Sequence, residues 1–223
     1  MRLVAVQPAQ VARGWSSAPA HWLRAAFRDV LLAPIIRAWC SPFQIAGTAP
    51  ASGPVVFVAN HASHLDAPAV LAALPRAVRR RLAIAAAQDY FYRRRLLGRL
   101  VSLGLGTFPF PRRGRRGLDR AAALLATGHS VLLFPEGTRS LDGSQQPFKH
   151  GVGHLLRETG VPVVPVAIVG THAAWPKGQR WPRRGQVRVA FGEVWRPQPH
   201  LTPAEIADDL TAKCCAAGQA PAT

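Results

Sequence analysis

At 223 residues the chain is long enough for one α/β domain with a sizeable core and a short N-terminal addition. Its 28 Lys and Arg residues against 11 Asp and Glu residues give a net charge of +17, which excludes cationic partners and points to anionic ones. Lipid headgroups, phosphorylated metabolites, an acidic carrier protein and nucleic acid all fit that charge. No helix-turn-helix, zinc-finger or aromatic RNA-binding signature is present, so we expect no nucleic-acid partner.

An apolar fraction of 48% and a mean hydropathy of +0.06 are high for a chain in which no segment reads as a membrane span, and they point to a membrane surface. The positive charge is nearly all arginine, in short clusters that either form a solvated surface or bind anionic lipid at roughly 1 kcal/mol for each group. The three cysteines lack the spacing of a metal site, so we expect a reduced, intracellular protein. No signal peptide is apparent at the start of the chain.

The N-terminal part of the chain changes character after its first twenty residues. Residues 1–20 are rich in Ala, Pro, Gln and Ser and are predicted to be a disordered lead-in. In residues 21–48, apolar side chains such as Trp22 and Phe27 recur at three- and four-residue steps with arginines between them. This predicts an amphipathic, membrane-associating helical segment that is bent or broken near Pro34. Its apolar face can lie in the interface plane of a bilayer or, alternatively, pack on the protein's own core.

Residues 49–217 alternate short apolar runs with helical patterns. Candidate strands cover residues 55–59, 83–87, 106–110, 131–134, 163–168 and 187–191. Candidate helices cover residues 66–74, 90–103, 115–127, 150–158 and 203–216, the last beginning at the capping-box sequence Thr202-Pro203-Ala204-Glu205. This alternation predicts a single α/β domain whose mostly parallel or mixed sheet is covered by helices.

The segment that follows the first strand reads Asn60-His61-Ala62-Ser63-His64-Leu65-Asp66, and such strand ends are where α/β proteins hold reactive groups. His61 can take a proton near neutral pH, and Asp66 can return to the other ring nitrogen and fix the orientation of the imidazole. A structural alternative makes Asp66 the N-cap of the next helix. The segment has the parts of a base with its orienter but no nucleophile bound to that base in sequence, so the nucleophile is expected to belong to the substrate.

The segment that follows the run 131–133 reads Phe134-Pro135-Glu136-Gly137-Thr138-Arg139-Ser140. Its proline cannot donate to a sheet ladder and its glycine permits positive φ, so we expect a sharp turn that projects Glu136, Thr138 and Arg139. Arg139 offers forked donors suited to phosphate, which predicts an anion-binding loop. The alternative is an ordinary polar turn with an internal Glu/Arg pair.

Two further apolar segments carry prolines. One reads Gly106-Thr107-Phe108-Pro109-Phe110-Pro111-Arg112 and ends in arginine. In structural terms it is explained by an edge strand, since its prolines forbid regular pairing, followed by a solvated basic loop. The other reads Val161-Pro162-Val163-Val164-Pro165-Val166 and is more suited to shaping a wall than to chemistry.

In this order the four segments resemble the PlsC-like glycerolipid acyltransferase family, whose best-known members are 1-acyl-sn-glycerol-3-phosphate acyltransferases. The resemblance is carried by N-H-x4-D at Asn60, His61 and Asp66, by G-x5-R at Gly106 and Arg112, by F-P-E-G-T-R-S at 134–140 and by V-P-V-V-P-V at 161–166. It spans roughly residues 25 to 195 and implies that residues 49–217 form an acyltransferase domain.

The resemblance also implies a reaction. His61 would be the general base that deprotonates the acceptor hydroxyl, and Asp66 would orient it. A fatty acyl group would pass directly from acyl-CoA or acyl-carrier protein to the sn-2 hydroxyl of lysophosphatidic acid, giving phosphatidic acid without an acyl-enzyme, a cofactor or a metal. The residues implied in acceptor binding are Arg112, Glu136, Gly137, Thr138 and Arg139, and those implied in an acyl or donor wall are Val161, Pro162 and Pro165. We expect a peripheral protein on the cytoplasmic face of the cell membrane, with an anionic membrane surface, the acyl donor and a lysophospholipid acceptor as partners.

The chain departs from the family pattern on the acceptor side. Many relatives carry a lysine where this chain reads Ala86-Ala87-Gln88-Asp89-Tyr90, and an acidic residue where it has Pro111. The acceptor is therefore open to alternatives, namely glycerol 3-phosphate, another lysophospholipid or a lyso-aminolipid.

Two readings from other classes compete with acyl transfer. A metal-dependent hydrolase of the H-x-H-x-D-H type would use His61, His64 and Asp66, but two of its ligands are absent from the sequence. A non-catalytic basic membrane- or nucleic-acid-binding protein would explain the charge but not three separate motifs at strand ends.

Overall fold

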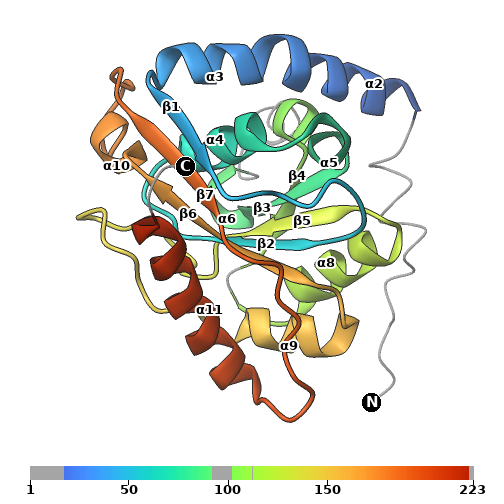
Figure 1. Cartoon of the computed structure of the whole chain (residues 1–223). Helices are drawn as coiled ribbons and strands as arrows, with labels where there is room; N and C mark the ends of the chain where they lie inside the picture. The colour runs from blue at the N-terminus through green and yellow to red at the C-terminus, as the bar shows by residue number, and fades with distance from the viewer. Residues whose placement is uncertain (1–17, 92–101, 112, 221–223) are drawn as a thin grey trace.

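A seven-stranded sheet forms the centre of the computed structural model, which describes residues 18–91, 102–111 and 113–220 (Figure 1). The strands are β1 (Phe43–Ala46), β2 (Val56–Ala59), β3 (Leu82–Ala87), β4 (Thr107–Phe110), β5 (Ser130–Leu133), β6 (Val163–Val169) and β7 (Val187–Phe191). Their order is β1-β7-β6-β2-β5-β3-β4, and every neighbouring pair is parallel except β6 and β7. The predicted α/β fold with a mostly parallel or mixed sheet is therefore confirmed.

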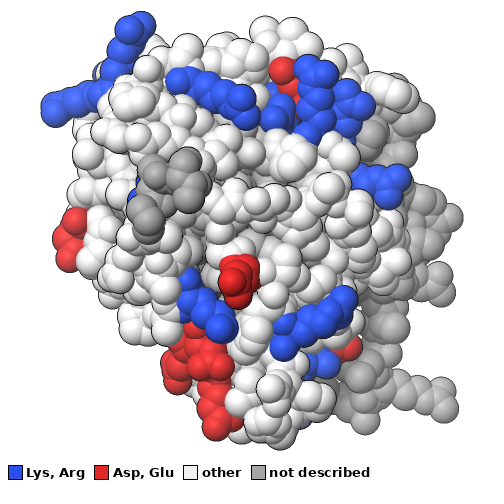
Figure 2. Space-filling model, in the orientation of Figure 1, with Lys and Arg blue, Asp and Glu red and all other residues white. Residues whose placement is uncertain are grey.

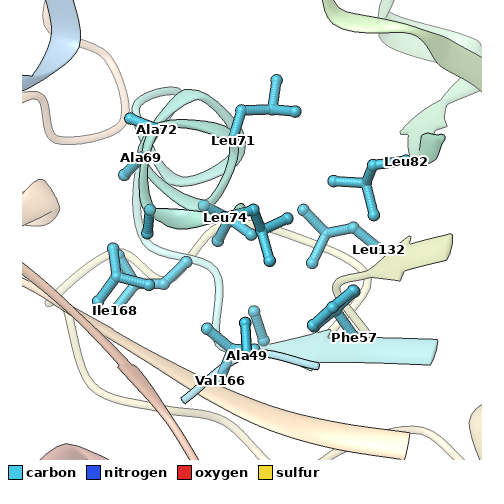
Figure 3. Close-up of a cluster of buried hydrophobic side chains, with 14 of the residues drawn as sticks. Ala49, Phe57, Ala69, Leu71, Ala72, Leu74, Leu82, Leu132, Val166 and Ile168 are labelled. Carbon is cyan, nitrogen blue, oxygen red and sulfur yellow. The ribbon is translucent and has the colours of Figure 1, made fainter. Parts of the chain in front are cut away.

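Helices cover both faces of the sheet, which explains why its central strands are almost continuously apolar. The helices that follow β2 in the chain are α4 (Asp66–Ala73), α5 (Arg76–Arg80), α6 (Gln88–Phe91), α8 (Arg116–Ala126), α9 (Gly151–Thr159), α10 (Thr171–Ala174) and α11 (Pro203–Gln219). On one face, Leu74 at the end of α4 points toward Phe57 and Leu132 of the sheet (Figure 3). On the other face, Val58 and Leu133 pack with side chains of α8, α9 and α11.

Most of the predicted elements lie within a few residues of the observed ones. The predicted helices 66–74, 115–127, 150–158 and 203–216 correspond to α4, α8, α9 and α11. The capping box at the start of α11 is confirmed, because the Thr202 side chain accepts from the Glu205 backbone N–H and the Glu205 carboxylate accepts from that of Thr202. The predicted helix 90–103 lies mostly outside the described residues.

The sequence reading missed the edge strand β1. Its four residues were placed in the N-terminal helical segment 21–48, but they pair in parallel with β7. A run this short gives too few alternations for a period of two to stand out from a neighbouring helical pattern.

The N-terminal helix is irregular at its centre. It consists of α2 (Ala18–Ala26), a π-helical segment η1 (Phe27–Leu32) and α3 (Ala33–Trp39). The predicted distortion near Pro34 therefore takes the form of widened turns directly before it, as expected where a proline without an N–H leaves a carbonyl of the preceding turn unbound. Within the described ranges no helix is long and apolar enough to cross a membrane.

This helix turns its apolar side outward. The apolar helix face, as we call it, consists of exposed side chains of Trp22, Leu23, Phe27, Val30, Leu31 and Ile35. The opposite side is buried and carries charge, since Arg28 is 0% and Asp29 only 8% exposed, and its residues Ala33 and Ile36 lie in the core. The side chains of the apolar helix face therefore do not pack on the protein's own core, although the buried side of the same segment does.

Buried charges bind the polar side of the helix to the rest of the domain. The Arg28 guanidinium donates to the carbonyls of Arg79, Leu82 and Leu105, and Asp29 accepts from Arg79 and Arg80 at 3.0 Å each. Burial lowers the pKa of Arg28 to about 9, so the group stays protonated at neutral pH. A buried cation is tolerated here because three carbonyl dipoles replace its hydration.

Gly106, the first residue of the G-x5-R motif, makes room for this guanidinium. Its φ is +61°, and a Cβ at this position would collide with Nη2 of Arg28. The motif glycine therefore has a packing role that its spacing in the sequence did not reveal.

We predict that Gly106→Ala lowers the free energy of unfolding by more than its backbone conformation alone requires. Gly160 is the matched control, because its φ is also +61° but no atom lies within 4 Å of a Cβ there. Gly160→Ala should cost about 1–2 kcal/mol for the left-handed backbone. Gly106→Ala should cost about 2 kcal/mol more, because it displaces a charged donor from buried carbonyls. Urea unfolding measures both, and equal losses, or an excess that persists in an Arg28→Met background, would contradict the assignment.

Candidate active site

Two segments singled out in the sequence meet a third, which was not, at one edge of the sheet. Strands β2, β5 and β6 are parallel neighbours, so their carboxyl ends lie together. Residues 60–66 follow β2, residues 134–140 follow β5, and Gly170 and Thr171 follow β6. In parallel sheets this edge is where ligands are held.

An imidazole and a buried carboxylate form the centre of this edge. Nδ1 of His61 lies 2.7 Å from Oδ2 of Asp66, whose side chain is 0% exposed. Because a carboxylate only accepts, Nδ1 carries the proton and Nε2 is left as the basic nitrogen of the neutral ring. The His61 side chain is 23% exposed, so this ring can meet a bound molecule.

Oδ2 of the Asp66 carboxylate binds groups that come before Asp66 in the chain. Oδ2 also accepts from the backbone N–H groups of Ala62 and Ser63, at 2.7 and 2.8 Å. The N-cap of α4 is Leu65, so the alternative of Asp66 as the N-cap is wrong. As the first residue of α4, Asp66 instead places its negative charge at the positive end of the helix dipole.

Thr171 is a functional candidate that the sequence reading missed. Its Oγ1 donates to Oδ1 of Asp66 at 2.5 Å, and the side chain is 1% exposed. Asn60 makes a second link to β6, since its side-chain amide donates to the carbonyl of Ile168 and accepts from its N–H. The available signal was a threonine just beyond the end of a parallel strand, which no motif of the chain emphasised.

The loop after β5 holds the backbone of His61 on both sides. Oε1 of Glu136 accepts from the His61 N–H at 3.0 Å, and the Ser140 N–H donates to the His61 carbonyl at 2.8 Å. The ring of Phe134 stacks on the imidazole with centroids 4.3 Å apart. The first and third motifs of the sequence are thus one structural unit.

Glu136 is a carboxyl group in a water-poor setting. It is 5% exposed, and burial raises its pKa to about 7, although the His61 N–H favours the charged form. His64 is affected in the opposite sense, because burial together with the charges of Arg139 and His61 lowers its pKa to about 4. The ring of His64 lies 5.4 Å from that of Trp175.

Basic groups border the loop after β5. Gly137 has φ +76°, and a Cβ on it would collide with the Lys149 ammonium, so the glycine lets that cation lie against the turn. Arg139 is half-buried and Thr138 is exposed. The sharp turn predicted from Pro135 and Gly137 is present, with Gly137 N–H donating to the Phe134 carbonyl.

The structure does not bring every expected site residue to His61. Arg112 lies outside the described residues. Val161 and Pro162 precede β6, so they lie at the opposite edge of the sheet, where the Pro162 carbonyl accepts from Val56 at the start of β2. Pro165 is buried in the middle of β6, in register with Val58. This placement gives no support to a wall beside His61.

The ligand sets that metal sites need do not assemble in what the structure describes. No group of three or more His, Cys, Asp or Glu side chains that could hold a metal ion occurs among these residues. His61, His64 and Asp66, which the hydrolase reading grouped together, do not form such a set there.

Comparisons with known proteins point to one family. The family model described as acyltransferase matches residues 43–169. A 1-acyl-sn-glycerol-3-phosphate acyltransferase of Limnanthes douglasii is 33% identical over 141 residues, covering 61% of this chain and 48% of the relative. One of Chlamydomonas reinhardtii is 35% identical, covering 78% and 49%, and the human alpha enzyme is 34% identical, covering 70% and 55%. The chain spans about half the length of the curated relatives it matches.

A solved structure agrees with these relatives. The crystal structure of the 1-acyl-sn-glycerophosphate (LPA) acyltransferase PlsC from Thermotoga maritima superposes with a TM-score of 0.67 at 28% identity. The similarity covers 85% of this chain and 79% of that one.

The raised pKa of Glu136 predicts a pH-dependent stability. Between the ordinary glutamate pKa of 4.5 and about 7, the unfolded chain has lost this proton while the folded chain keeps it, so stability falls as the pH rises through this window. Glu136→Gln removes the titration but keeps the acceptor for the His61 N–H. Relative to wild type, the variant should gain up to about 3 kcal/mol in the free energy of unfolding between pH 4 and pH 8.

Urea unfolding at the two pH values measures this difference. Glu193→Gln is the control, since Glu193 is exposed. A Glu136→Gln variant whose stability tracks that of wild type at both pH values would show that the buried carboxyl does not hold its proton.

Proposed function

This chain belongs to the acyltransferase family, as its motifs predicted, and we propose that it transfers a fatty acyl group to the sn-2 hydroxyl of lysophosphatidic acid. The product would be phosphatidic acid, an intermediate of phospholipid biosynthesis. The substrate named in this proposal is supported by the names of the relatives and of the solved structure.

The observation that carries the proposal is the His61–Asp66 pair without an enzyme nucleophile. Within the described part of the chain, no Ser or Cys side chain hydrogen-bonds to the His61 ring, and Ser63 is buried with its hydroxyl donating to the Trp175 carbonyl. A base that lacks a nucleophile of its own is suited to activating a hydroxyl of the substrate.

The proposed step is a direct displacement. Nε2 of His61 takes the proton of the acceptor hydroxyl as its oxygen attacks the thioester carbonyl carbon. The resulting C–O bond replaces the C–S bond when the tetrahedral intermediate collapses. The imidazolium returns the proton to the leaving thiolate, and Asp66 stabilises that imidazolium while it exists.

We assign acceptor binding to the loop after β5. Arg139 and the nearby Lys149 supply positive charge for the acceptor's phosphate, and Arg112 is proposed to join them. Glu136, Gly137 and Thr138 shape this loop. Glu136 has a second role, because its bond to the His61 N–H fixes the base relative to the phosphate-binding side chains.

Either acyl-CoA or acyl-carrier protein fits the donor role. Both bring phosphate or acidic side chains to a chain of net charge +17. The chemistry of the proposed step needs no further cofactor, because the thioester itself is activated.

We infer that the protein works at an anionic membrane surface, on the cytoplasmic face. The apolar helix face exposes two aromatic and four aliphatic side chains in one stripe, which suits insertion at the interface of a bilayer. Its buried arginine side leaves the helix fixed to the domain, so the bound protein would be peripheral.

We predict that His61→Ala lowers kcat/KM for acyl transfer by about 10³-fold or more, because the hydroxyl loses its base. The assay offers the purified protein a labelled acyl thioester with a panel of acceptors: lysophosphatidic acid, glycerol 3-phosphate, other lysophospholipids and a lyso-aminolipid. Mass spectrometry of the lipid product identifies the acceptor. His154→Ala, at an exposed position of α9, is the control and should keep wild-type activity.

Two outcomes would contradict the proposal in different ways. Wild-type transfer by His61→Ala would remove the assignment of the base. A product formed only from another acceptor in the panel would keep the base and replace lysophosphatidic acid.

We predict that Thr171→Val lowers kcat about tenfold with little change in KM, because Asp66 loses a donor and with it part of its fixed orientation. A carboxylate with one donor fewer is more basic and holds the imidazolium more strongly. The acidic limb of the pH profile of kcat/KM should therefore move to higher pH. Thr171→Ser should restore both values, whereas an unmoved pH profile in Thr171→Val would reduce Thr171 to a packing role.

A further inference from the structure

Residues 175–186 form an ordered loop after α10, which we call the tryptophan loop. The Arg183 N–H donates to the Ala174 carbonyl at 2.8 Å and closes the loop at its base. Inside it, the indole N–H of Trp175 donates to the Gln179 carbonyl, and the backbone N–H of Gln179 donates to the Pro176 carbonyl. Such internal bonds are typical of compact surface loops with defined shape.

The tip of this loop places an indole in solvent. Trp181 is 69% exposed, and the guanidinium of Arg180 lies over its ring, 5.6 Å from the centroid. The loop carries four exposed basic residues, Lys177, Arg180, Arg183 and Arg184, and its sequence contains no acidic residue. An exposed tryptophan surrounded by cations is the combination found where proteins contact anionic bilayers.

The tryptophan loop is continuous with the N-terminal helix. The indole N–H of Trp39, the last residue of α3, donates to the Arg183 carbonyl at 3.1 Å, and the Arg184 guanidinium lies 5.6 Å from the centre of the Trp39 ring. In Figure 1 the loop rises beside the end of α3. Figure 2 shows basic side chains at this corner of the molecule and along the edge over the N-terminal helix.

The other end of the loop touches the turn that carries the proposed base. The Ser63 hydroxyl donates to the Trp175 carbonyl at 2.8 Å, and the Trp175 ring contacts that of His64. Ser63 and His64 belong to the same turn as His61 and Asp66. The tryptophan loop therefore bridges the N-terminal helix and the edge of the sheet where the acceptor is proposed to react.

We propose that the tryptophan loop is a second contact with the anionic membrane surface, with Trp181 entering the lipid interface. This inference rests on the proposed function, because a lipid acceptor must leave a bilayer to reach His61. With the apolar helix face as the only contact, the domain could roll about the helix axis. A contact off that axis fixes the roll and holds the His61 edge of the sheet toward the bilayer.

The test measures binding of the full chain to vesicles of phosphatidylglycerol and phosphatidylcholine. Trp181→Ser should weaken partitioning about tenfold, and Trp181→Phe should keep most of it. Val194→Ser is the matched control, because Val194 is also exposed but neighbours Trp195, which pairs with Val163 at the opposite edge of the sheet. Its partitioning should stay within about twofold of wild type, since it lies away from the contact. Urea unfolding should find both serine variants folded.

A second readout uses acyl chains brominated at a defined depth. If Trp181 enters the interface, the bromine atoms should quench its fluorescence. The quenched fraction of the tryptophan fluorescence should therefore be smaller in Trp181→Phe than in wild type. Phosphatidylcholine alone should bind wild type less tightly, because the basic side chains lose their counter-charges.

Activity assays separate this inference from the proposed function. Trp181→Ser should keep turnover of a short-chain lysophosphatidic acid dissolved as monomers, and lose turnover of the long-chain acceptor in vesicles. If wild type transfers no acyl group but Trp181→Ser still loses vesicle binding, the proposed function fails and the contact stands. If Trp181→Ser binds vesicles as wild type does, the contact fails whatever the activity.

Other occupants of the loop would overturn the inference. Trp181→Ser that weakens binding to RNA as much as to vesicles would make the loop a general polyanion site. A dimer in lipid-free solution that Trp181→Ser dissociates would assign the loop to a contact between copies of the chain.

Discussion

The structure of the site depends on one buried negative charge. The Asp66 carboxylate has no contact with water, and a buried anion is tolerated only when donors replace its hydration. The His61 ring, the Ala62 and Ser63 N–H groups and the Thr171 hydroxyl are those donors. Since they come from the loop after β2 and from the segment after β6, satisfying the charge draws two strand ends together. The dyad is thus a product of the same interaction that closes the fold at this edge.

Glu136 extends that arrangement to a third strand. Its carboxyl accepts from the His61 backbone rather than from the ring, so it controls where the imidazole lies without competing for its proton. The opposite pKa shifts of Glu136 and His64 have a common origin in burial, which favours the neutral form of each. Glu136 and His64 therefore both favour the state that adds no charge beside His61, which suits the proposed role of His61 as a base whose own charge appears and disappears.

Much of this could be predicted from the sequence, and the failures have physical reasons. Strands buried on both faces give continuous apolar runs, so β2, β5 and β6 were found, together with the motifs after β2 and β5, and the parallel sheet then required those two motifs to meet. The roles of Gly106 and Thr171 were not found, because each depends on a partner distant along the chain. The periodicity of the N-terminal helix was read correctly, but which side faces the protein is decided by Arg28, whose carbonyl partners no local pattern reveals.

The Arg28 contacts also bear on the order in which parts of the chain fold during synthesis. Their acceptor carbonyls lie 51, 54 and 77 residues further along the chain. While a ribosome is still producing those residues, the Arg28 guanidinium has no carbonyls to bind, whereas all residues of the apolar helix face have already been synthesised. Docking of this helix onto the domain is consequently a late folding event, and a nearby bilayer has the earlier opportunity to capture it. The proposed membrane contact would then precede completion of the domain.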